Sequence, residues 1–128
     1  MNEANRIEAA FLRKLPSDEA ANYLLEKYAD SYPVTIKHRS WKVADQFRLA
    51  RRFLQGRAFA SARPYQDFLS FMSLENFLKV VADGLSDIPE DRLDLLFYYL
   101  VPALRKAAKN DLQLKKVEEF IDRWSAGR

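Results

Sequence analysis

Residues 73–85, SLENFLKVVADGL, contain the pattern that predicts the fold of the whole chain. Their apolar side chains recur at intervals of three and four residues, which places them on one face of an α-helix: Leu74, Phe77, Leu78, Val81 and Leu85. Ser73 stands where the amides of the first turn need an acceptor, and Asp83-Gly84 closes the run as a helix end commonly does. The pattern therefore predicts a capped helix that buries one face.

The same pattern recurs along the chain and predicts seven helices joined by short connections. We expect them over residues 3–14, then from Ser17, from Ser40 to about 55, from Pro64, from Ser73, from Asp87, and after Asn110-Asp111. Ser17, Ser40 and Asp87 are the expected caps, Asp87 with Glu90 as a capping box. No stretch alternates like a strand. Residues 1–128 are therefore predicted to form a single all-α domain, an irregular helical bundle or a stack of helical hairpins.

The spacing also predicts details of individual helices. The buried face of the first helix is expected to carry Ile7, Ala10 and Phe11, and that of the third Val43, Phe47, Ala50 and Leu54. Pro102 lacks an amide donor and is expected to kink or break the sixth helix near residues 98–101. The three glycines, Gly56, Gly84 and Gly127, are each expected near a helix end in a left-handed cap.

Composition restricts the classes of function. The 128 residues include no cysteine and one histidine, His38, which excludes disulfides and thiolate chemistry and leaves no metal site to expect. The charged N-terminus does not resemble a signal peptide, and the apolar run that ends at Leu104 is too short to span a membrane. We expect a cytoplasmic protein without a membrane partner.

No pattern of catalytic residues is evident. The sequence has no glycine-rich phosphate loop, no Gly-x-Ser-x-Gly and no His-Glu-x-x-His. His38 falls in an expected loop where nothing nearby would orient it as a base. Asp91 and Asp94 fit the start of a helix, where carboxylates complement the helix dipole. We expect a protein that is not an enzyme and has no cofactor and no small-molecule substrate.

The positive charges gather in one part of the chain. Residues 37–63 carry eight basic side chains and one acidic side chain, against a net charge of +3 for the whole chain. Five arginines form the candidate basic partner-binding face: Arg48, Arg51, Arg52, Arg57 and Arg63. Arginine suits forked bonds with carboxylate or phosphate, so this face fits an acidic protein or a nucleic-acid backbone. A solvated face, partly paired within the fold, is the alternative.

A smaller acidic cluster is the second candidate for the binding surface. It consists of Asp87, Glu90, Asp91 and Asp94. These side chains fit a negative patch offered to a basic protein, or a helix start that needs no partner.

Residues 40–111 resemble helical immunity proteins of bacterial contact-dependent growth inhibition systems. The segments that carry the resemblance are Ser40-Trp41, Asp45-Gln46, Leu49-Ala50, Phe59-Ala60-Ser61, Pro64-Tyr65, Phe68, Ser70-Phe71-Met72-Ser73, Tyr99-Leu100-Val101-Pro102 and Ala107-Ala108-Lys109-Asn110-Asp111. The resemblance implies a cytoplasmic protein that binds and neutralises one cognate toxin domain, often a nuclease. A nucleic-acid-binding module that uses the arginine-rich third helix is the alternative, although we do not expect nucleic acid to be the partner.

Overall fold

The computed structural model describes residues 1–125, which contain seven α-helices, two short 3-10 helices and no strand. The α-helices are α1 (Glu3–Lys14), α2 (Ser17–Lys27), α3 (Val43–Phe53), α4 (Arg63–Leu69), α5 (Leu74–Gly84), α6 (Glu90–Ala107) and α7 (Asp111–Ser125). The 3-10 helices are η1 (Ile36–His38) and η2 (Leu85–Asp87). The prediction of a single all-helical domain is confirmed.

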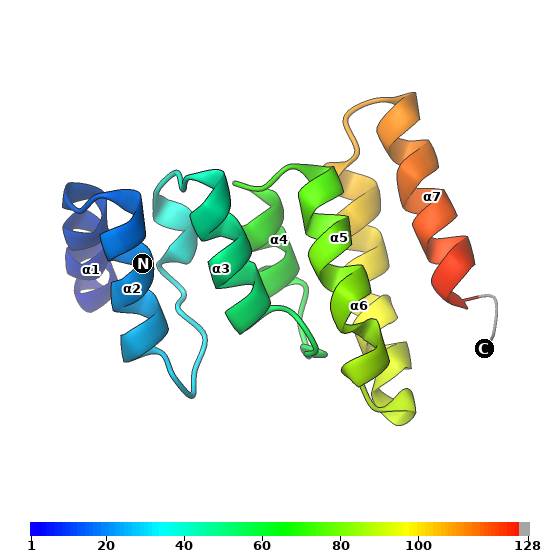
Figure 1. Cartoon of the computed structure of the whole chain (residues 1–128), viewed down its shortest axis with the longest axis horizontal. Helices are drawn as coiled ribbons and strands as arrows, with labels where there is room; N and C mark the ends of the chain where they lie inside the picture. Colours follow the sequence, from blue (N-terminus) through cyan, green and yellow to red (C-terminus); the bar gives the residue numbers. More distant parts are fainter. Residues whose placement is uncertain (126–128) are drawn as a thin grey trace.

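The helices form a row of antiparallel hairpins in two layers (Figure 1). One layer contains α2, α3 and α5, and the other contains α1, η1, α4 and α6. The last helix, α7, packs against α6 and ends the row. Of the two predicted architectures, this is the stack of helical hairpins.

The helix limits confirm some predicted caps and correct others. The Ser73 hydroxyl accepts from the amide of Asn76, as predicted. Ser17 is instead the first residue of α2, and its hydroxyl donates to Asp45 over 2.6 Å. No side chain caps α3 or α6, so the caps predicted at Ser40 and Asp87 are wrong. The N-cap residue is Lys42 in α3 and Pro89 in α6.

Helix α6 continues through Pro102, so the predicted break near residues 98–101 is wrong. Pro102 cannot donate to the carbonyl of Tyr98, four residues earlier. Both residues are exposed, with Tyr98 at 72%, so water can reach the missing position. The carbonyl that lacks its helical donor is therefore accessible to water.

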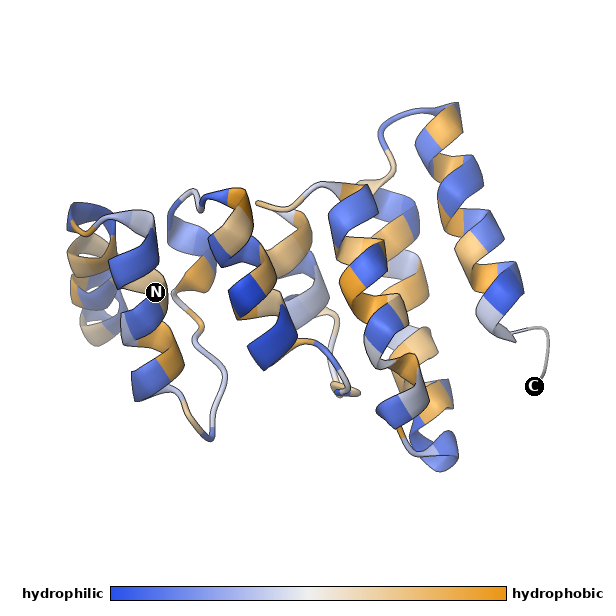
Figure 2. Cartoon of the chain, in the orientation of Figure 1, coloured by the Kyte–Doolittle hydropathy of each residue, from blue (hydrophilic) through white to orange (hydrophobic). Residues whose placement is uncertain are grey.

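Most of the core lies between the two layers, and Figure 2 shows hydrophobic bands on α5 and α6 and alternating bands along α7. The predicted buried face of α1 is rotated from the observed one, and that of α3 is correct in part. Ile7 and Phe11 are exposed, whereas Glu8, Ala9 and Leu12 are buried. In α3, Ala50 and Leu54 are buried as predicted, whereas Val43 is 55% exposed and Leu49 is buried in its place. The error arises because the two helices bury polar side chains that carry their own partners.

Gly84 is buried because two helix ends meet there. A Cβ on Gly84 would lie 2.5 Å from the amide nitrogen of Gly56 and 2.6 Å from Cγ of Gln55. Its φ is −101°, so the predicted left-handed cap is wrong, whereas Gly56 has a φ of 74° as predicted. Gly127 lies outside the described residues. The absence of a side chain at Gly84 lets the end of α3 approach α5.

Candidate functional site

The five arginines of the predicted basic face do not form one surface. Arg48, Arg51 and Arg52 lie on α3, Arg57 lies in the loop after it, and Arg63 begins α4 in the other layer. The predicted face is therefore divided between two layers and a connecting loop.

Two of the α3 arginines serve the fold. Arg48 donates to Asp45 over 3.0 Å and also to the side chain of Asn22. Arg52 donates to the backbone carbonyl of Ala29. These bonds connect α3 to α2 and to the loop after α2. Their guanidinium groups are therefore partly committed before any partner arrives.

Arg51 and Arg57 remain the more available members of the basic face. The Arg51 guanidinium lies over the ring of Phe47, 5.4 Å from its centre. Neither Arg51 nor Arg57 makes an ion pair within residues 1–125. Two separated cations form a weaker phosphate-binding surface than the five that the sequence predicts.

The acidic cluster is fully exposed at the start of α6. Asp87 closes η2, Glu90 and Asp91 stand in the first turn of α6, and Asp94 follows one turn later. Sequence reasoning placed these four carboxylates together correctly, because they lie on consecutive turns. None of them is buried, so the cluster presents its charge to solvent.

 An apolar hollow adjoins the acidic cluster. It has a volume of about 290 Å³. The lining residues are Leu85, Ser86, Ile88, Glu90, Leu93, Phe97 and Trp124. Glu90 thus belongs both to the hollow and to the acidic cluster.

A second hollow continues from the first along α7. It has a volume of about 510 Å³, lies between α5 and α7, and shares Trp124 with the first. We call the two together the Trp124 groove, defined by its apolar residues Leu78, Leu93, Phe97, Phe120 and Trp124. The α5–α7 part carries both signs of charge, including an ion pair of 3.2 Å between Lys116 and Glu75. Negative charge is therefore concentrated at the α6 end of the groove.

Arg63 lies instead beside η1, at a separate cavity of about 450 Å³. Lys37, His38 and Arg63 line it together with Met1, Asn5 and Val34. His38, predicted in a solvated loop, is half-buried in η1. Sequence reasoning missed this cluster because Arg63 lies far from Lys37 and His38 in the sequence, and only the fold brings them together.

A buried carboxylate stands next to that cluster. Asp67 is 3% exposed, accepts from the Tyr32 hydroxyl over 2.9 Å and lies 3.8 Å from Nζ of Lys37. Burial raises the pKa of Asp67 above its ordinary value of 3.8, against the hydrogen bond from Tyr32 and the charges of Lys37 and Arg63. Burial and the same carboxylate raise the pKa of Tyr32, which keeps its hydroxyl a donor.

A second buried carboxylate, Glu8, joins α1 to α2 and to the turn before η1. It accepts from Lys27 and Thr35, each over 2.5 Å, and from the hydroxyls of Tyr23 and Tyr28. Burial alone would raise the pKa of Glu8, but the hydrogen bonds from Lys27, Thr35 and Tyr28 outweigh it and lower the pKa below 4.5. Every donor is part of the fold, so we assign Glu8 a structural role.

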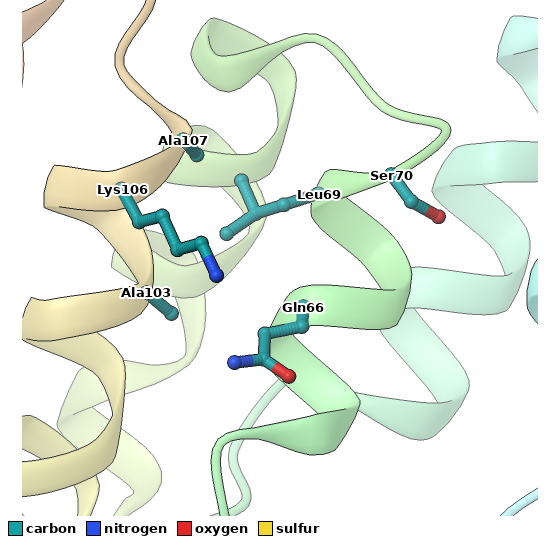
Figure 3. A pocket seen from close by; sticks show the side chains of 6 residues that line it. All are labelled: Gln66, Leu69, Ser70, Ala103, Lys106 and Ala107. Atoms are coloured by element: carbon teal, nitrogen blue, oxygen red, sulfur yellow. The ribbon is translucent and has the colours of Figure 1, made fainter.

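A further hollow between α4 and α6 has a volume of about 330 Å³ (Figure 3). Lys106 and Gln66 reach into it from the facing helices, beside Leu69 and Ala103. It holds one cation and no carboxylate or histidine, so it offers no acid–base pair.

Residues 1–125 contain no group of three or more acidic, histidine or cysteine side chains that could hold a metal ion. Within the same residues, no helix combines the length and hydrophobicity that crossing a bilayer requires. Comparison of the chain with protein-family models, characterised proteins and solved structures gave no match.

Proposed function

We propose that this protein is an immunity-type inhibitor that binds a cognate toxin domain and blocks it by covering its surface. The observation that carries the proposal is the Trp124 groove with the acidic cluster at its α6 end. Aromatic pockets bordered by charge are typical of the centres of protein interfaces. The resemblance of residues 40–111 to immunity proteins names the kind of partner.

The charge of the groove favours a basic toxin surface. Nuclease domains contact the phosphate backbone through lysine and arginine, so their working surfaces are positive. Asp87, Glu90 and Asp91 would attract such a surface and accelerate the encounter. A side chain of the toxin that enters the hollow beside Phe97 and Trp124 would then supply the slow dissociation.

The size of the protein is sufficient for this role. A stable interface buries about 800 Å² on each partner. That is about a tenth of the 7506 Å² of accessible surface on this chain. One end of the hairpin row can therefore supply the whole contact.

The basic face supports the nucleic-acid alternative less well. Arg48 and Arg52 are bonded to Asp45, Asn22 and the Ala29 carbonyl, and Arg63 lies in the other layer. A backbone-binding surface needs several free cations together.

The test is co-expression with the toxin domain encoded beside this protein, followed by co-purification and a growth assay. We expect growth and a one-to-one complex. Glu90→Lys with Asp91→Lys should slow association and lessen its salt dependence, whereas the matched reversal Arg51→Glu with Arg57→Glu should not. Cell death with no complex recovered would refute the proposal. If only the arginine variant associates more slowly, the basic face is the toxin-binding surface and the Trp124 groove is not.

A further inference from the structure

The cavity beside η1 brings two cations, Lys37 and Arg63, together with only one carboxylate, Asp67, close to them. The guanidinium of Arg63, the ring of His38 and the side-chain amide of Asn5 line it, and none of these groups bonds to another side chain within residues 1–125. Lys37 lines the same cavity and has Asp67 as its partner at 3.8 Å, longer than a hydrogen bond.

The fold holds this wall in place. Ile36 is fully buried, and its carbonyl accepts from Nε1 of Trp41 over 2.9 Å. Arg13 donates to the carbonyl of His38 over 3.3 Å. Arg39 donates to the carbonyls of Leu12 and Leu15 at the end of α1, over 2.6 and 2.8 Å. The turn that carries Lys37 and His38 is therefore anchored on both sides.

The charges of the cavity do not balance. Asp67 is buried behind the wall and shares its carboxylate between Tyr32 and Lys37. Asp67 feels the charges of both Lys37 and Arg63, so one carboxylate stands against two cations and one positive charge is left over. A planar guanidinium and an ammonium group that line the same cavity can together bind several oxygens of a phosphate-type anion.

We propose that this cavity binds a phosphate-type oxyanion, through Arg63 and Lys37, with His38 and Asn5 as further contacts. The volume of about 450 Å³ exceeds the need of a free phosphate, so the same chemistry also fits the phosphate group of a nucleotide. The site is separate from the Trp124 groove and does not depend on the proposed toxin inhibitor role.

The experiment is a titration of the full chain with inorganic phosphate, and separately with adenosine monophosphate, followed by amide chemical shifts. Sodium chloride at equal ionic strength is the reference. We expect saturable shifts centred on residues 34–38 and Arg63. Tighter binding of the nucleotide than of phosphate would identify a nucleotide as the source, and equal binding a free phosphate.

Variants distinguish a specific binding site from nonspecific attraction of the anion to positive charge. Arg63→Gln and Lys37→Gln should each weaken binding about ten- to hundredfold, the effect of losing one charge-assisted hydrogen bond. Arg92→Gln also removes one positive charge, but on α6 and outside the cavity. This control variant should bind phosphate as tightly as the unaltered chain does. Retained shift dispersion shows that each variant is folded. Shifts that do not saturate, or equal losses in the Arg63 and Arg92 variants, would overturn the proposal.

Discussion

Replacing Glu8 by glutamine should destabilise the protein although the side chain keeps its size. Glu8 is 7% exposed, and its two oxygens receive bonds from Lys27, Thr35, Tyr23 and Tyr28. A glutamine has one oxygen acceptor, and its amide nitrogen would face donors on the other side. Lys27 would also lose its charged partner.

The magnitude follows from the bonds that change. A hydrogen bond to a charged group contributes about 1.5–3 kcal/mol, and the hydroxyls of Tyr23 and Thr35 can turn to accept from the new amide. Lys27 is half-exposed, so water recovers part of its loss. We therefore expect a loss of about 2–3 kcal/mol, or about 6–15 °C in Tm.

The measurement is denaturant unfolding of the Glu8→Gln variant, with Glu26→Gln, an exposed glutamate of α2, as the control. Because the folded-state pKa of Glu8 is lowered, its contribution is present above pH 4.5 and is lost as the pH falls through the folded-state value. The difference between the variant and the unaltered chain should therefore shrink below pH 4.5. A difference within about 0.5 kcal/mol of the control at pH 7 would refute the reasoning.

Two further predictions concern packing and nucleic acid. Gly84→Ala should destabilise the protein by about 1–3 kcal/mol in thermal unfolding, because its Cβ would meet the Gly56 amide nitrogen at 2.5 Å; an unchanged Tm would show that the end of α3 can move away without cost. In fluorescence anisotropy, we expect no submicromolar binding to DNA or RNA at about 0.15 M salt. If such binding is found, Arg51→Gln and Arg57→Gln should each reduce the salt slope by about one.

The helical class and the helix positions follow from sequence because they depend on neighbours within one or two turns. The amphipathic spacing of residues 73–85 and the Ser73 cap are local, and both are confirmed. The acidic cluster was also recognisable, since its members lie on consecutive turns. By contrast, the sequence predicts a kink or break near residues 98–101, and it does not show that Pro102 is exposed to solvent, where the helix can continue.

Tertiary structure alone decided which faces are buried and which charges are free. Glu8 lies inside because its partners come from residues 15 to 27 positions away, a separation over which periodicity carries no information. The same holds for Arg48 and Arg52, whose acceptors lie on α2 and in the loop after it. Gly84 is required by the approach of α3, not by its own backbone angle. Local spacing determines the helices, and the contacts between distant segments determine what each helix does.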